Sequence, residues 1–317
     1  MQATAPAASY IIIDGFNIVG NAQSITADQA QSAVNFNNST NGNCIGAGAL
    51  SNHVIVRKNT ISWCPGNGII ASGDYVYIYQ NVIHHNSFWS PLDTSGITVS
   101  GKDSDSYTGI KVLVYSNILY ANQNFICNQF QTTPCRITDG EGIIVDSNVD
   151  AAFGGRVRIY NNVSYNNGGP GIEVYRSQHV DVMNNTTYMN NVSASAPAPY
   201  TAHTAGGEIA ISQSNDVIIA NNVIYGTAGV PVIYGGITSV TKLYWDYNLM
   251  FNGDGSKAMG AHDLIVDPLF VGSASFDFHL DGSSPALGNG TPAFSPDHDI
   301  EFNPRPRGSA SRGAYQY

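Results

Sequence analysis

The chain has 317 residues, of which 43% are hydrophobic and only 11% are charged, and its formal net charge is −10. This length suits one long repetitive domain, and the composition excludes both a coiled coil and a disordered chain. No apolar run reaches the ~18 residues that a membrane span requires, and an acidic chain is a poor match for nucleic acid. We therefore expect neither a membrane nor nucleic acid as a partner.

A strand-like pattern recurs along the chain, with Val, Ile and Tyr alternating with polar residues. After a degenerate first copy at 10–18, the copies occupy 53–61, 75–83, 111–119, 156–164, 179–187, 216–224 and 242–250. Seven copies carry an asparagine at the same place: Asn59, Asn81, Asn117, Asn162, Asn185, Asn222 and Asn248. The shortest spacings, 22 and 23 residues, give the base period, and the longer spacings indicate loop insertions. Alternation with period 2 in such residues predicts strands.

A second strand, of the form G-I-x-V, precedes most of these copies. It occurs at 68–72, 96–100, 142–146, 171–175 and, with Glu in place of Gly, at 208–212. Each repeat then holds this strand, a turn, the longer strand, an asparagine at a bend and a third short strand. Stacked repeats of this kind predict a single all-β domain, a right-handed parallel β-helix of about 8–10 rungs. The aligned asparagines would form an internal ladder of hydrogen-bonded side chains.

The two ends of the chain differ from the repeats. Residues 264–317 break the period, so we predict a C-terminal capping segment of the same domain, which has its rungs in 1–263. At the other end the chain enters the repeat almost at once, which predicts a monomer or a dimer that pairs through an uncapped N-terminal edge. Residues 1–9 show no basic region followed by an apolar one, so we expect no signal peptide within this chain.

The four cysteines, Cys44, Cys64, Cys127 and Cys135, form no C-x-x-C pair. Cys127 and Cys135 flank a short loop, while Cys44 and Cys64 lie nearly one period apart. We predict at least one disulfide rather than four buried thiols. A disulfide indicates an extracellular or periplasmic location.

Two long runs and the tail carry a family resemblance. The runs SWCPGNGIIASGDYVYIYQNVIHHN and NNGGPGIEVYRSQHVDVMNNTTYMNN, with the tail DPLF…DFHL…SPALG, resemble the right-handed parallel β-helix proteins of the pectate-lyase-like superfamily. The resemblance covers nearly the whole chain. It implies an active site on the sheet of G-I-x-V strands, in a superfamily that contains lyases, hydrolases, epimerases and non-catalytic proteins.

Loop insertions flank the same strand. Those at 87–94, 122–140 and 190–207 precede it, and those at 101–109 and 147–155 follow it. Loops on both sides of one sheet predict a groove along its outer face, and an inward-facing Ile turns the flanking positions outward.

The outward positions of this strand supply the first candidate residues, Asp146, Glu173, Tyr175 and Glu208. Most rungs have Gly where Glu208 stands, so we expect Glu208 to reach over an open floor.

Several carboxylates near this groove form a candidate calcium site. Asp139 and Glu141 precede the strand that ends at Asp146, and hard oxygen ligands of this type bind Ca²⁺. An ordinary solvated acidic face is the alternative.

The resemblance implies β-elimination, in which the ion bridges a uronate carboxylate and Arg or Lys takes the C5 proton. Arg176 fits the base best, with Lys102 and Arg136 as weaker candidates. A salt bridge from Arg176 to Asp146 or Asp181 is the structural alternative.

A carboxylate pair offers a second chemistry, glycoside hydrolysis. Glu173 and Glu208 lie on adjacent rungs with backbones roughly 8 Å apart, and Asp146 is the other candidate partner. Trp89 and Tyr175 are candidate sugar-stacking platforms, and His203 is a candidate substrate ligand beside Glu208.

We therefore predict a secreted carbohydrate-active enzyme that cleaves a uronate-containing polysaccharide by β-elimination. The alternatives are a glycoside hydrolase with a Glu/Asp pair and a non-catalytic carbohydrate-binding or adhesin β-helix. A lyase predicts calcium dependence and unsaturated products, whereas a hydrolase predicts neither.

Overall fold

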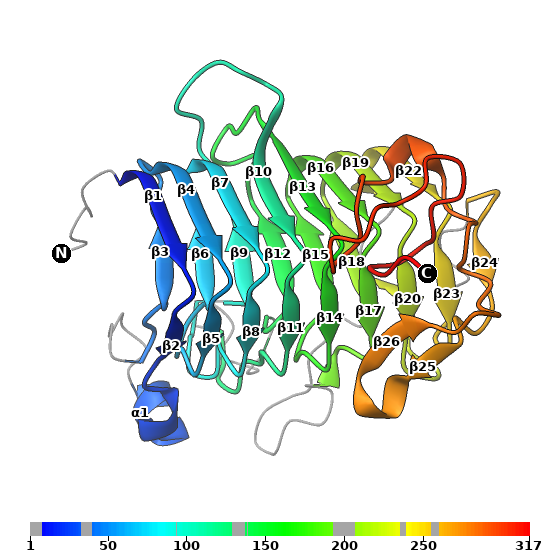
Figure 1. Ribbon diagram of the computed structural model, residues 1–317. Coiled ribbons are helices and arrows are strands. Elements are labelled where there is room, and N and C mark those ends of the chain that lie inside the picture. The colour runs from blue at the N-terminus through cyan, green and yellow to red at the C-terminus, as the bar shows by residue number, and fades with distance from the viewer. Residues whose placement is uncertain are drawn as a thin grey trace.

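Three parallel sheets run the length of the molecule in the computed structural model (Figure 1), and successive strands of the chain enter them in turn. The structure describes residues 8–32, 40–92, 94–128, 137, 139–192, 207–234, 239–254 and 260–317. Every pairing within the three sheets is parallel and joins neighbouring rungs, as in Ile143 with Ile172. The predicted right-handed parallel β-helix is confirmed.

The strands of each rung have unequal lengths. Sheet A holds the longest ones: β1 (Ser9–Asp14), β4 (Asn52–Arg57), β7 (Asp74–Tyr79), β10 (Ile110–Tyr115), β13 (Arg156–Tyr160), β16 (Gln178–Met183), β19 (Asn215–Ala220) and β22 (Thr241–Asp246). Sheet B follows it along the chain: β2 (Asn17–Val19), β5 (Thr60–Ser62), β8 (Val82–His84), β11 (Ile118–Tyr120), β14 (Val163–Tyr165), β17 (Thr186–Tyr188), β20 (Val223–Tyr225), β23 (Leu249–Phe251) and β24 (Leu264–Ile265).

Sheet C contains the G-I-x-V strands: β3 (Ile45–Ala47), β6 (Ile69–Ala71), β9 (Ile97–Val99), β12 (Ile143–Asp146), β15 (Ile172–Tyr175), β18 (Ile209–Ser212) and β21 (Ile233–Tyr234). The remaining elements are short: η1 (Ala22–Ser24), α1 (Ala27–Ser32), the antiparallel pair β25 (Phe270–Gly272) and β26 (Asp277–Leu280), η4 (Ser273–Ser275) and η5 (Pro292–Phe294). Within the described part of the chain, no helix is long and apolar enough to cross a membrane.

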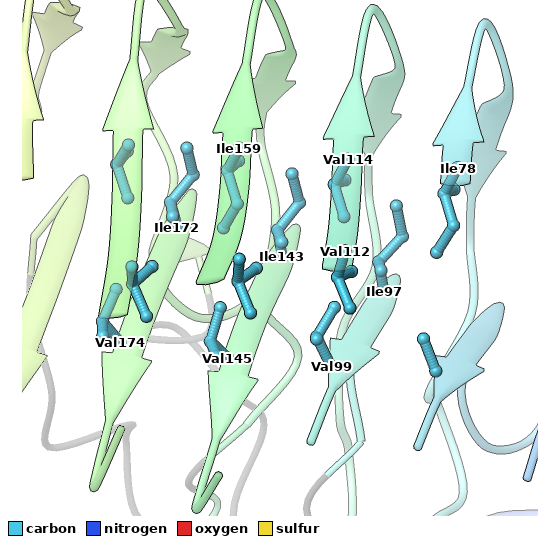
Figure 2. Packing of buried hydrophobic residues seen from close by; sticks show 14 of the residues in the cluster. Ile78, Ile97, Val99, Val112, Val114, Ile143, Val145, Ile159, Ile172 and Val174 are labelled. Atoms are coloured by element: carbon cyan, nitrogen blue, oxygen red, sulfur yellow. The ribbon is translucent and has the colours of Figure 1, made fainter. Parts of the chain in front are cut away.

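The interior consists of columns of like residues. Ile97, Ile143 and Ile172 stack from rung to rung in sheet C, and the valines two positions later form a second column facing sheet A (Figure 2). All of these side chains are fully buried. Because each rung presents the same residue type to the next, the period-2 pattern fixes both the register and the core.

The asparagine ladder is confirmed at the bend between sheets A and B. The amide of Asn117, for example, donates from Nδ2 to Asn162 Oδ1 at 3.0 Å and to the Ile78 carbonyl at 2.9 Å. Its own Oδ1 accepts from both the N–H and the Nδ2 of Asn81 at 3.0 Å. Each ladder side chain therefore satisfies backbone groups that the bend leaves without sheet partners.

Substituting one central ladder residue tests this account. Asn162→Ala is expected to lower the free energy of unfolding by about 2–4 kcal/mol, because it leaves the buried Asn117 N–H and Val114 carbonyl without partners. Urea unfolding measures the loss. Asn17→Ala, on the exposed edge strand β2, is the control and is expected to change stability by less than about 0.5 kcal/mol. Equal effects of the two substitutions would contradict a stabilising ladder.

One predicted disulfide is present, between Cys44 and Cys64, which are 20 residues apart in sequence. Cys135, the expected partner of Cys127, lies outside the described residues.

The segment after residue 263 has two parts, one at the end of the stack and one along its side. Its first strand, β24, extends sheet B at the end of the stack, and the rest folds back along the outside of the rungs (Figure 1, orange to red). Asn161, Asn184 and Asn221 hold it there, because their side chains donate to the carbonyls of His298, Ser311 and Thr291. Most of the predicted cap therefore covers the side of the helix rather than its end.

Candidate functional site

The insertions flank sheet C, as the sequence predicted, wherever the structure describes them. Those at 87–94, 122–140 and 190–207 lie between a strand of sheet B and the next strand of sheet C. Those at 101–109 and 147–155 lie between sheets C and A. Their described parts surround the middle strands β9, β12 and β15.

Two half-buried carboxylates point outward from these middle strands. Ile144 pairs with Glu173, and Asp146 pairs with Tyr175, so Asp146 and Glu173 lie on adjacent strands two residues out of register. A strand spacing of about 4.8 Å and a two-residue rise of about 6.6 Å put their backbones roughly 8 Å apart. Sheet C thus presents a carboxylate pair at the spacing that the sequence predicted for Glu173 with Glu208.

Glu141 lies just before β12, the strand that pairs with the strand of Glu173, and is fully buried. Its Oε2 accepts a hydrogen bond from Ser95 Oγ at 2.5 Å. Its Oε1 has no N–H or O–H partner among the described residues and lies in the closely packed space beside Gly169. The nearby titrating group is the carboxyl group of Glu173, whose negative charge raises the pKa of Glu141. Two carboxyl groups this close together are most stable when one of them carries a proton.

Burial is the largest cause of an upward pKa shift in both groups. Burial, followed by the charge of Glu173, raises the pKa of Glu141 well above its usual value. Burial, with a smaller effect of the charge of Asp146, raises the pKa of Glu173 to about 7, although the interaction with Glu141 lowers it in part. The pair titrates as a unit and holds one proton near neutral pH. Its solvent-accessible member, Glu173, therefore suits general acid–base chemistry at that pH.

Glutamate is rare in this protein, which makes its placement informative. The whole sequence contains four, Glu141, Glu173, Glu208 and Glu301, and the first three lie on or beside sheet C. The sequence analysis paired Glu173 with Glu208 and assigned Glu141 to a metal. The structure brings Glu173 and Glu141 together instead.

Glu208 is part of a second ladder and does not lie on the outer face of sheet C. Asn86, Asn122, Asn167 and Asn190 form hydrogen-bonded steps at the corner before sheet C. Glu208 accepts the N–H and the Nδ2 of Asn190 at 2.8 and 2.7 Å and ends this ladder.

The prediction that Glu208 reaches over an open floor was wrong. The aligned glycines face the interior ladder, and a Cβ at Gly171 would lie 2.7 Å from Asn190 Nδ2. Glycine is required there because the ladder fills the corner.

Glu208 predicts a pH dependence of stability. Burial raises its pKa to about 8 in the folded protein, whereas an unfolded Glu titrates near 4.3. The folded state therefore binds more protons between these values, so this contribution to stability is complete below about pH 4 and is lost as the pH rises through 8. Urea unfolding between pH 5 and 8.5 should show this decline, and Glu208→Gln should make it shallower. Equal slopes in the two proteins would contradict the assignment.

Arg176 lies at the end of β15, exposed beside Asp146. Its Nη2 donates to Asp150 Oδ1 at 3.0 Å, in an ion pair whose members are 45% and 52% exposed. The predicted salt bridge to Asp146 or Asp181 is therefore wrong, because the 147–155 loop supplies a nearer carboxylate and Asp181 binds Arg156 and Arg158. Asp150 raises the pKa of Arg176, and burial raises that of Asp146.

The remaining candidates are dispersed. Trp89 anchors its loop, since its Nε1 donates to the Ala22 carbonyl at 2.8 Å and its ring packs on Phe125; its role as a sugar platform stays a prediction. Lys102 is exposed on the loop after β9, and Tyr175 points outward beside Asp146. His203 and Arg136 lie outside the described residues.

The predicted calcium ligands do not form a set. Glu141 is turned toward Ser95 and Glu173, and no group of three or more His, Cys, Asp or Glu able to hold a metal occurs in the described ranges. Asp139, Glu141 and Asp146 as they stand do not fit a calcium site.

A buried lysine that the sequence analysis missed fixes the 101–109 loop beside sheet C. Lys111 is fully buried and lies between Asp103 at 2.7 Å, Asp105 at 2.8 Å and Asp74 at 3.2 Å. A β-bulge between Ile110 and Val112 sets its direction. Asp103 and Asp105 thus tie the 101–109 loop to β10.

No protein-family profile and no curated protein matches the sequence. Several solved structures are similar, including the following three. The A-module of the mannuronan C-5 epimerase AlgE4 of Azotobacter vinelandii has a TM-score of 0.42 and 16% identity, over 71% of this chain and 52% of that one. XylC in complex with xylose has a TM-score of 0.41 and 14% identity, over 83% and 50%. Pectate lyase Pel9A has a TM-score of 0.41 and 13% identity, over 98% and 97%.

All three are parallel β-helix proteins, and the sheet pairing described above makes this chain another. The chain spans about half the length of the first two. At these identities the likeness concerns the fold and says nothing about activity.

Proposed function

We propose that this protein is a carbohydrate-active enzyme that cleaves a polysaccharide on the outer face of sheet C. Glu173 is its general acid, and Asp146 is the second carboxylate. The observation that carries the proposal is the carboxyl pair of Glu141 and Glu173 at sheet C, in which burial raises both pKa values, that of Glu173 to about 7.

Hydrolysis is the chemistry that this pair supports best. Glu173 gives its proton to the leaving glycosidic oxygen as the bond from that oxygen to the anomeric carbon breaks. Asp146 then either activates the attacking water or attacks the anomeric carbon itself, according to the separation of the two carboxyl groups. Glu141 has no exposed surface, so it acts only through Glu173, whose titration it shifts.

Arg176 favours an acidic glycan. Its ion pair with Asp150 is exposed on both sides, and such surface pairs are worth only about 0–1 kcal/mol. A uronate carboxylate can therefore take the place of Asp150. This contact also supports a second candidate, β-elimination, because neutralising the uronate carboxylate acidifies the C5 proton. Arg176 itself is a poor base there, since Asp150 raises its pKa, and Glu173 is the nearer base.

Product analysis tests the proposal. Wild type and Glu173→Gln are incubated with polygalacturonate, alginate and glucuronoxylan, with calcium and then with a chelator. New reducing ends without the ultraviolet absorbance of unsaturated uronates would establish hydrolysis, and that absorbance would establish elimination. Either product is expected to be lost in Glu173→Gln. No product from any of the three glycans would contradict the proposal and favour a non-catalytic binding protein.

A further inference from the structure

The C-terminal segment crosses the outer face of sheet A as an arch. One end is fixed where the Thr291 N–H donates to Asn221 Oδ1 at 2.8 Å. The other is fixed where the His298 carbonyl accepts from Asn161 Nδ2 at 2.7 Å. Residues 292–297 between these points, here called the arch, cover a cavity of about 330 Å³ whose floor is formed by β10, β13 and β16. This face is separate from sheet C.

A second cavity, of about 540 Å³, adjoins the first. It lies between the arch and residues 305–310, and Ser295, Pro296 and Asp297 line both cavities. Its walls are held in place, because the buried Arg305 guanidinium donates to the carbonyls of Ser311, Gly313 and Ala314. Pro292, Pro296 and Pro306 further restrict the backbone. The two cavities form one preformed cleft. Because its walls are already fixed, little conformational entropy is lost when a ligand binds.

The cleft combines aromatic side chains with hydrogen-bond donors and an acceptor. Tyr160 and Phe294 line the first cavity, and one face of the Tyr160 ring is stacked on Tyr115. Arg158 uses its Nε on Asp181 at 3.1 Å, and its two Nη atoms donate no hydrogen bond within the described residues. Arg307 is exposed and likewise has no partner in the part of the chain that the structure describes. Asp297, in the shared wall, is 94% exposed; its Oδ1 contacts His298 Nδ1 at 2.5 Å, and its Oδ2 is the acceptor on offer.

We propose that this cleft is a carbohydrate-binding site, distinct from sheet C. Sugar hydroxyl groups both donate and accept hydrogen bonds, which suits two guanidinium groups facing one carboxylate. The C–H faces of a sugar ring pack against Tyr160 and Phe294. A polyphosphate or nucleic acid fits less well, because Asp297 and the net charge of −10 repel it. The inference does not depend on catalysis at sheet C.

Calorimetry on cavity-filling variants tests the proposal. All titrations use the Glu173→Gln background, so that the probes stay intact, and the probes are hexamers of galacturonate and of xylose. Ala293→Trp fills the first cavity from an exposed position without removing a structural side chain. Ala261→Trp, at an exposed alanine that lines neither cavity, is the matched control. Arg307→Ala removes one donor without filling the cleft.

The expected result is binding of at least one hexamer that Ala293→Trp weakens about tenfold or more, that Arg307→Ala weakens, and that Ala261→Trp leaves unchanged. Equal Kd values in all four proteins would overturn the proposal, as would the absence of binding by both hexamers. Loss of binding in Ala293→Trp together with an inactive wild type would support the cleft and reject only the catalytic proposal.

Discussion

Glu173→Gln is expected to lower kcat by about 10²–10⁴-fold on whichever uronate glycan the wild type cleaves. The amide has the shape of the carboxyl group but can neither give up nor take a proton. Reducing-end or unsaturated-product assays measure the loss. Folding is expected to be intact, because the glutamine side chain has the same size and shape and keeps the packing contacts of Glu173. Activity within about twofold of wild type would contradict the role of Glu173 as general acid.

Two further substitutions test whether the effect is specific to Glu173 and whether Glu141 acts through it. Glu301→Gln, at an exposed glutamate in the C-terminal segment, is the control and is expected to leave kcat unchanged. Glu141→Gln keeps an acceptor for Ser95 and donates a permanent N–H to Glu173. Because the glutamine cannot ionise, it is expected to replace the linked titration of the pair by a single titration of Glu173 and so to change the shape of the pH profile, with less effect on the maximal kcat. An unchanged pH profile would show that Glu141 does not act through Glu173.

Lys111→Met is expected to produce the largest loss of stability, about 3–5 kcal/mol. Lys111 and Asp74 are both 0% exposed, so the substitution leaves a buried carboxylate without its cation. Asp103 and Asp105 lose the same partner, and the 101–109 loop loses its attachment to β10. Urea unfolding measures the stability, and limited proteolysis in the 101–109 loop measures the attachment.

Lys102→Met is the matched control for that loop. It removes an exposed lysine of the same loop and is expected to change stability by less than about 0.5 kcal/mol. A loss of less than about 1 kcal/mol in Lys111→Met would mean that the acidic cluster is solvated in solution.

The repeat made the fold predictable from the sequence. One strand pattern at a near-constant period specifies the stacked sheets, and Asn59 through Asn248 specify the bend between sheets A and B. The Asn-Asn pairs at 161–162, 184–185 and 221–222 also indicate where the C-terminal segment binds. The second residue of each pair joins the ladder, and the first binds the C-terminal segment.

The site was less predictable, because strand alternation fixes a side chain's direction only within a strand. Glu208 stands where the chain turns a corner, so a position that counts as outward faces the interior ladder. Glu141 also precedes its strand, and its burial depends on the packing around Gly169. Lys111 follows a β-bulge, which alternation does not predict. Within β12 and β15 the rule held, and Asp146, Glu173 and Tyr175 all point outward.

The shared proton of Glu141 and Glu173 is the central claim, and carboxyl NMR tests it directly. With four glutamates in the chain, ¹³C-labelled Glu gives four side-chain carboxyl signals, which Glu141→Gln and Glu173→Gln assign. The expected result is that Glu173 titrates with an apparent pKa of about 7 and that the Glu141 signal moves with it, as one coupled pair. A Glu173 signal that titrates near 4.3, and that Glu141→Gln leaves unchanged, would contradict the claim.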